Sequence, residues 1–153
     1  TPAGSAKTPA VPVFFVLHGY GESGTNMEQS AGFDTVAQAN QFLAIYPDGY
    51  SNSWNTGYGQ GQADELMVDD VAFIEAILAR VAKDQPVDPQ RVFATGFSMG
   101  AGMTHHPGGE PSLKLAAIPP REGALWGRPF PPAIPVAVLQ IPGTVSTARP
   151  HRF

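Results

Sequence analysis

The stretch Arg91-Val92-Phe93-Ala94-Thr95-Gly96-Phe97-Ser98-Met99-Gly100 decides the fold of this chain. It opens with a mostly apolar run, which is typical of a buried strand, and continues into a Gly-x-Ser-x-Gly motif. In that motif the chain turns sharply from a strand into a helix, and the backbone approaches itself so closely that small residues must flank the serine. The sequence therefore predicts a strand, a tight turn at Ser98 and a helix that begins near Met99.

A serine in such a turn has its hydroxyl lifted above the sheet, and the next N–H faces the oxygen that becomes negative during nucleophilic attack. Three fixed residues recur by chance in about 5% of chains of this length, so the motif alone is a weak signal. The strand before it and the Gly-rich run from Met99 to Met103 supply the context that it needs. We predict that Ser98 is a nucleophile, with a purely structural turn as the alternative.

Five short apolar runs predict strands: Val13 to Leu17, Phe42 to Tyr46, Arg91 to Thr95, Leu115 to Ile118 and Val136 to Ile141. They alternate with helical segments and are nearly continuous in their hydrophobicity, which indicates a parallel sheet covered on both faces. The fold class is therefore α/β, with about five mostly parallel strands. In such sheets the chemistry lies where strands end and helices begin.

Helical spacing marks two segments. One runs from Asn26 to Asn40, and the other begins at Asp69 or Asp70 and is stopped by Pro86 and Pro89. We interpret the two aspartates as a helix start, where negative charge is favoured, rather than as paired catalytic carboxylates. The predicted core residues are apolar and recur every three or four positions: Met27, Ala31, Phe33, Val36 and Ala37 in the first helix, and Val71, Phe73, Ile74, Ile77, Leu78 and Val81 in the second.

The length of 153 residues suggests one domain, and a hydrophobic content of 42% makes wholesale disorder improbable. The net charge of −4 argues against nucleic acid or anionic membranes as main partners. No apolar run is long enough for a membrane span, and the absence of cysteine excludes disulfides and thiolate metal sites. The first residues, 1–10, read as a flexible segment left by processing or by fragmentation of a longer chain.

The segment after the first strand fits two templates. His18-Gly19-Tyr20-Gly21 stands where this architecture places its second oxyanion donor, with a simple glycine turn as the alternative. Gly19, Gly21 and Gly24 also form a Gly-x-Gly-x-x-Gly pattern, and Asp48 ends the next strand, as in a dinucleotide-binding fold. Glu22 would place a negative charge beside the pyrophosphate of such a ligand. A dinucleotide-binding fragment is therefore the weaker alternative.

Histidines and loop residues complete the candidates. His18 is expected to hydrogen-bond beside the site rather than to act as a base, and His105 and His106 are expected on the surface, too far along the helix to reach Ser98. His151 lies near the C-terminus, and no spacing suited to a metal is present. In the polar loop that follows the second strand, Trp54 and Asn55 are expected to be exposed, either at a substrate-binding rim or packed within the loop.

Taken together, these segments resemble the polyhydroxybutyrate depolymerase / feruloyl esterase family of α/β-hydrolases. The match covers residues 11–145, most clearly 11–105, and residues 146–153 form a tail. The resemblance implies a secreted serine esterase without a cofactor, acting on polyesters or plant cell-wall esters. Ser98 would be the nucleophile, and the backbone N–H groups of Tyr20 and Met99 would form the oxyanion hole. The matching stretches are Val16 to Gly21, Tyr46 to Gly49, Ser53 to Gly57, Asp70 to Ile74 and Val87 to Gly100.

The chain departs from this family towards its C-terminus. The family has a His-Gly-Thr-x-Asp pattern whose Asp is the catalytic acid, whereas this chain reads Pro142-Gly143-Thr144-Val145-Ser146. The catalytic His of the family lies further downstream, and this sequence stops at Phe153. We therefore expect an incomplete α/β-hydrolase domain with impaired activity. A non-catalytic substrate-binding remnant is the alternative, and self-association through exposed sheet edges is expected.

Overall fold

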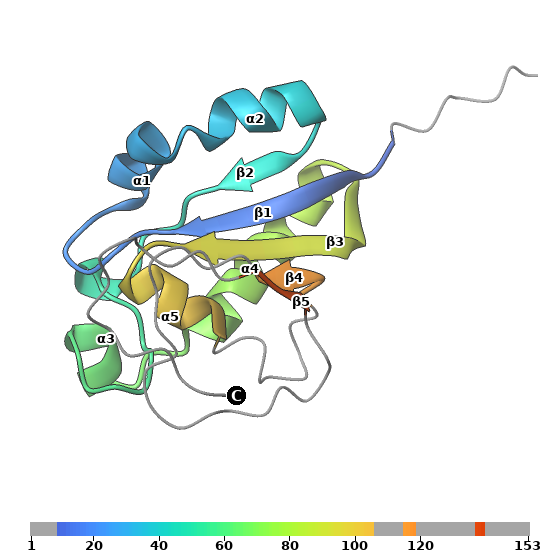
Figure 1. The fold of residues 1–153 in the computed structure, drawn as a ribbon. Coiled ribbons are helices and arrows are strands. Elements are labelled where there is room, and N and C mark those ends of the chain that lie inside the picture. Colours follow the sequence, from blue (N-terminus) through green and yellow to red (C-terminus); the bar gives the residue numbers. More distant parts are fainter. Residues whose placement is uncertain (1–8, 106–114, 119–136, 140–153) are drawn as a thin grey trace, which may run out of the picture.

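In the computed structural model, residues 9–105, 115–118 and 137–139 are described. Five parallel strands form one sheet in the order β2-β1-β3-β4-β5, in which β4 and β5 have two residues each (Figure 1). No helix within the described ranges is both long and apolar enough to cross a membrane. The elements in chain order are β1 (Val11–Leu17), α1 (Gly24–Ala31), α2 (Phe33–Asn40), β2 (Leu43–Ile45), the 3₁₀ helix η1 (Tyr50–Asn52), α3 (Gln62–Glu65), α4 (Asp70–Asp84), β3 (Val87–Gly96), α5 (Met99–His105), β4 (Ala117–Ile118) and β5 (Ala137–Val138).

Helices cover both faces of the sheet. Alternate side chains of β1 point to opposite faces, so each face has apolar residues for helices to cover. Phe15 and Leu17 are fully buried in the main core cluster, which also contains residues of α4 and α5. On the opposite face, Phe14 stacks on Phe93 with ring centroids 4.5 Å apart, and Phe33 at the start of α2 lies 6.1 Å from the Phe14 ring. Figure 1 shows α1 and α2 along one side of β1 and β2. The predicted α/β class is confirmed.

The segment from Asn26 to Asn40 is not the single helix that its spacing predicts. Gly32 adopts a left-handed conformation, with φ of 66°, and separates α1 from α2. The change of direction turns Val36 outward, so that 50% of it is exposed, while Ala37 stays buried. The prediction that Val36 belongs to the core is therefore wrong. An isolated glycine inside a helical pattern is tolerated in many helices, and here it ends one.

The helix α4 begins where the sequence predicts. Asp69 caps it by accepting a hydrogen bond from the Ala72 N–H at 2.9 Å, and Val71 and Ile74 are buried. Phe73, a predicted core residue, is instead 40% exposed. It lies one position before Ile74, and the side chains of adjacent helical residues point about 100° apart. Only the Ile74 side chain therefore faces the sheet.

The strand β3 begins before the predicted Arg91 and includes Pro89, one of the two prolines that were predicted to stop the preceding helix. Val87 still pairs with Val11, but the register of β1 and β3 shifts between Val11 and Val13. Such an irregularity accommodates a proline, which has no N–H to donate to the ladder. Within the two later apolar runs, Ala117–Ile118 form β4 and Ala137–Val138 form β5. The predicted tail, residues 146–153, lies outside the described residues, and of the predicted segment 1–10 only residues 9 and 10 are described.

Candidate active site

Ser98 lies at the tight turn between β3 and α5. Its φ of +50° falls in the left-handed region, which is strained for a residue with a side chain, and the serine is exposed. A Cβ on Gly96 would collide with the backbone of Gly100, and a Cβ on Gly100 would collide with the carbonyl group of Leu17. The flanking glycines are therefore sterically required. This is the geometry that the Gly-x-Ser-x-Gly motif predicts.

The end of β1 lies beside this turn. Leu17 pairs with Gly96 in the sheet, and the Phe97 N–H donates to the Leu17 carbonyl at 3.1 Å. The parallel strands thus bring the segment after β1 to the same edge of the sheet as Ser98. Met99 is the first residue of α5, a position whose N–H has no partner inside the helix. The fold therefore brings together the segments that carry the predicted oxyanion donors.

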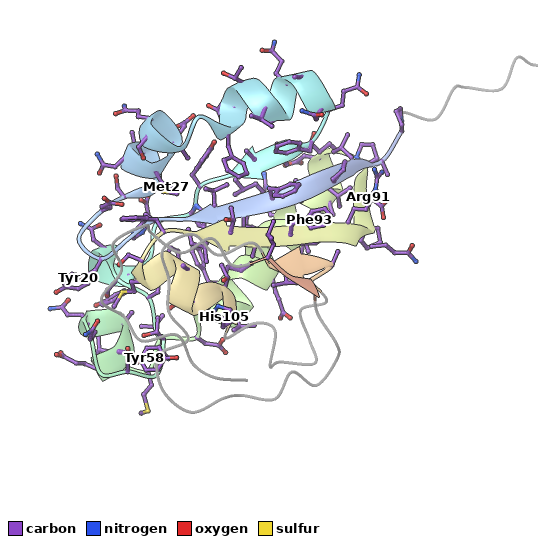
Figure 2. All side chains as sticks on the ribbon, in the orientation of Figure 1. Tyr20, Met27, Tyr58, Arg91, Phe93 and His105 are labelled. Carbon is purple, nitrogen blue, oxygen red and sulfur yellow. The ribbon has the colours of Figure 1, made fainter. Side chains whose placement is uncertain are left out.

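A cavity of about 420 Å³ adjoins Ser98. Figure 2 shows Tyr20 and Tyr58 on the same side of the molecule, at the end towards which β1 and β3 run and away from Arg91. Tyr20, Ser98 and Met99 all line the cavity, so the structure unites these three predicted site residues. The complete lining is Tyr20, Thr56, Tyr58, Gln60, Gly61, Ser98, Met99 and Gly102.

His18 lies beneath the segment that follows β1 and is fully buried. Its Nε2 accepts a hydrogen bond from the Gly49 N–H at 2.9 Å, so its Nδ1 carries the proton and donates to the Gly19 carbonyl at 2.8 Å. Both ring nitrogens are therefore hydrogen-bonded to backbone groups. As the sequence predicts, His18 is a hydrogen-bonding residue beside the site and is not available as a base.

Trp54 is not at a substrate-binding rim. Its side chain is fully buried, its indole N–H donates to the His18 carbonyl at 2.9 Å, and the two rings lie 4.8 Å apart. Asn55 is also used within the fold, since its side-chain amide donates to Val68 at 2.8 Å and its backbone N–H to Asp70 at 2.6 Å. The prediction of exposure is wrong because a polar, Gly-rich sequence does not reveal that this segment packs between the sheet and α4.

The same loop supplies cavity residues that the sequence reasoning missed. Thr56, Tyr58, Gln60 and Gly61 form one wall of the space beside Ser98. The one local signal is a tyrosine set among glycines from Gly57 to Gly61, since exposed aromatic residues on a loop are common in binding sites. Which part of the loop faces Ser98 is decided by tertiary packing.

The Gly19, Gly21 and Gly24 segment does not present a free phosphate site. The Asp48 carboxylate accepts a hydrogen bond from the Gly24 N–H at 2.6 Å, and the Glu22 carboxylate accepts one from the Gly19 N–H at 3.1 Å. Carboxylates thus occupy backbone donors that a pyrophosphate would require. The geometry argues against the dinucleotide alternative.

His105 is half-buried at the end of α5, not on the surface as predicted. Its Nε2 is buried and has no hydrogen-bond partner among the described residues, and burial lowers the pKa of the imidazole. Seven residues of helix place it about 10 Å along the axis from Ser98. His106, Ser146 and His151 lie outside the described residues. Within the described ranges no group of three or more Asp, Glu or His side chains is arranged to hold a metal.

Curated proteins with similar sequences are esterases. The chain is 27% identical over 142 residues to the bifunctional acetylxylan esterase/xylanase XynS20E of Neocallimastix patriciarum, covering 93% of this chain and 20% of that protein. It is 28% identical over 152 residues to feruloyl esterase B of Piromyces equi, covering 94% of this chain and 27% of that protein. The chain therefore spans about a quarter of the length of these relatives or less. No family profile matches it.

Solved structures with a similar fold were also found, and some of them are named as esterases. Arabidopsis thaliana SOBER1 superposes with a TM-score of 0.62 at 19% identity, covering 86% of this chain and 73% of that one. The acetyl xylan esterase from Aspergillus awamori has a TM-score of 0.55 at 19% identity, covering 77% and 43%. At such identities the structural likeness establishes the fold alone, which is that of the α/β-hydrolases. With the sequence relatives, it confirms the predicted resemblance to feruloyl esterases.

Proposed function

We propose that this α/β-hydrolase, a relative of the feruloyl and acetylxylan esterases, hydrolyses carboxylic esters with Ser98 as the nucleophile. The observation that carries the proposal is the geometry of Ser98. It has a left-handed backbone, is exposed, and opens on a cavity that Tyr20 and Met99 also line. A left-handed serine at a strand-to-helix turn costs conformational free energy, and strain of this kind clusters at active sites.

In the proposed reaction, the Ser98 hydroxyl loses its proton to a base and its oxygen attacks the ester carbonyl. The backbone N–H groups of Tyr20 and Met99 stabilise the negative oxygen of the tetrahedral intermediate. The base returns the proton to the leaving oxygen as the intermediate expels the alcohol, which leaves an acyl-enzyme on Ser98. A water molecule then loses a proton to the base and attacks the acyl group, and the base passes this proton to the Ser98 oxygen as the acid is released. The chemistry of this sequence of steps requires no cofactor.

Neither histidine among the described residues is placed to act as the base. His18 has both nitrogens engaged, and His105 is a helix length away from Ser98. We propose that this chain is an impaired esterase, since Ser146 stands where the resembling family has its catalytic Asp. Without a complete triad, the oxyanion hole and binding still leave an acceleration on the order of 10³–10⁴ over water. The alternative consistent with this feature is a non-catalytic remnant that keeps substrate binding.

The proposed substrates are esters of the plant cell wall, by analogy with relatives whose names refer to feruloyl and acetylxylan esters. Polyesters of the polyhydroxybutyrate type are the second candidate class, from the sequence resemblance. An extracellular location is proposed on the same basis. The strand β2 stands at one edge of the sheet, and self-association through such an edge is part of the proposal.

Hydrolysis of 4-nitrophenyl acetate by the wild-type chain and by Ser98→Ala tests the proposal. The matched control is Ser30→Ala, which removes an exposed hydroxyl on α1. We expect turnover that Ser98→Ala lowers to the residual rate of the oxyanion hole and binding, and that Ser30→Ala leaves unchanged. A fluorophosphonate probe should label the same serine, as peptide mass spectrometry would show. Equal rates in wild type and Ser98→Ala, with no label on Ser98, would contradict the proposal.

A further inference from the structure

We infer that Asp64 is a positioning residue, which holds residues 56–61 as one wall of the Ser98 cavity and thereby sets how tightly an ester binds. The inference rests on the proposed function, because it assigns the cavity to the substrate. Asp64 itself is not among the residues that line the cavity. It lies behind the wall, on the short helix α3.

Four hydrogen bonds converge on the Asp64 carboxylate. One oxygen accepts from the Thr56 hydroxyl at 3.1 Å, the Tyr58 N–H at 3.2 Å and the Gln60 N–H at 3.3 Å. The other oxygen accepts from the Gly57 N–H at 2.8 Å. Hydrogen bonds to an ionised acceptor are about twice as strong as neutral ones, so this single side chain organises the whole loop.

The loop that Asp64 holds is the wall itself. Thr56, Tyr58 and Gln60 bond to the carboxylate, and all three also line the cavity. Gly61 continues the wall and touches the oxyanion segment, because a Cβ there would lie 2.9 Å from a ring carbon of Tyr20. A displaced loop would therefore change both the shape of the cavity and the support of Tyr20.

The helix that carries Asp64 is anchored independently. The Ala63 N–H donates to the Ser53 hydroxyl oxygen at 3.0 Å, and Ala63 is fully buried. The Ser53 hydroxyl in turn donates to the Tyr50 carbonyl at 2.8 Å. Asp64 thus has a fixed base from which to hold the loop. The loop segment from Thr56 to Gln60 has five residues, of which the last four, from Gly57 to Gln60, are exposed.

Charge is essential to this arrangement. An amide in place of the carboxylate has one acceptor oxygen, and its NH₂ group would face N–H donors of the loop. Burial and the nearby Asp64 charge raise the pKa of the Tyr58 hydroxyl, so that this phenol remains protonated at the cavity. Asp64→Asn therefore preserves the shape of the side chain and removes the charge that strengthens its hydrogen bonds to the loop.

The test compares Asp64→Asn with Asp84→Asn, which removes the same charge from an exposed ion pair with Arg80. Hydrogen exchange is measured for the amides of Gly57, Tyr58 and Gln60, and KM and kcat are measured for 4-nitrophenyl acetate. We expect Asp64→Asn to accelerate the exchange by about tenfold and to raise KM severalfold, with a smaller change in kcat. Asp84→Asn should match wild type in both measurements.

The two readouts separate a positioning role from damage to the fold. Partial unfolding would lower the apparent kcat through the active fraction and leave KM unchanged. Unchanged exchange in Asp64→Asn, or faster exchange with an unchanged KM, would overturn the inference. If Ser98→Ala hydrolyses the ester as fast as wild type, the proposed function fails. In that case the role of Asp64 is decided by hydrogen exchange of the loop amides together with the affinity for an unreactive ester analogue, 4-nitroacetophenone. Faster exchange with weaker binding in Asp64→Asn supports the role, and no change in either overturns it.

Discussion

Gly100 lies directly against the carbonyl oxygen of Leu17, so that the first turn of α5 touches the end of β1. The contact joins the turn that holds Ser98 to the segment that leads to Tyr20. Any side chain at Gly100 would separate them. The arrangement of the nucleophile and the two proposed oxyanion donors therefore depends on one missing Cβ atom.

Replacement of Gly100 by alanine should destabilise the fold by about 3 kcal/mol or more, because the new Cβ collides with backbone that cannot move aside. Gly102→Ala in the same helix is the matched control. Its Cβ would meet Thr56 at 3.6 Å, an ordinary contact, and alanine favours the helix by about 0.5–1 kcal/mol. Urea unfolding followed by circular dichroism measures both. Equal stability of the two variants would contradict the close approach.

The adjacent aspartates at the start of α4 should differ in their effect on stability. Asp70 is buried and accepts the Asn55 N–H at 2.6 Å, so Asp70→Ala should cost about 2–3 kcal/mol by leaving a partly buried donor unpaired. Asp69→Ala removes only an exposed helix cap and should cost about 1 kcal/mol. Thermal unfolding at neutral pH gives the comparison. A larger loss for Asp69→Ala would show that the loop does not depend on Asp70.

His18→Phe should destabilise the chain by about 1–3 kcal/mol although it keeps an aromatic ring of similar size. The buried Gly49 N–H loses its acceptor at 2.9 Å, and no water can replace it in a fully buried position. Tyr46→Phe is a suitable control, because its hydroxyl bonds to Asp34 at an exposed site. Chemical denaturation of both variants checks the prediction. A wild-type midpoint for His18→Phe would rule out the hydrogen bond as a support of the loop.

His105 should make the stability of the fold depend on pH. Burial lowers its pKa from the usual 6.5, so the unfolded chain binds a proton more readily than the folded one. Above pH 6.5 the difference in proton binding between the two states does not lower stability. As the pH drops below that value and through the lower pKa of the folded state, the free energy of unfolding falls. His105→Leu should lose less stability than wild type between about pH 7 and pH 5. Identical pH profiles of denaturant midpoints would refute this.

The sequence carries the local parts of the site clearly. A strand followed by Gly96-Phe97-Ser98-Met99-Gly100 has one sterically acceptable turn, so its conformation follows from the residues themselves. The prediction for His18 is also confirmed, because a polar side chain at the end of a buried strand must find partners there. Gly32 shows the limit of periodicity, since the same pattern fits one helix or two.

Long-range packing decided what the sequence left open. Trp54 and Tyr58 stand four residues apart in one polar loop, yet one is fully buried on His18 and the other lines the cavity. Composition treats them alike, because burial depends on which distant surface a loop meets. The sequence by itself therefore determined the parallel sheet and the turn at Ser98, which follow from hydrophobic periodicity and local sterics, and its motifs carried the resemblance to esterases. Only the tertiary structure placed Asp64 behind the loop and the tyrosines beside Ser98, since those contacts join segments whose separation along the chain carries no periodic signal.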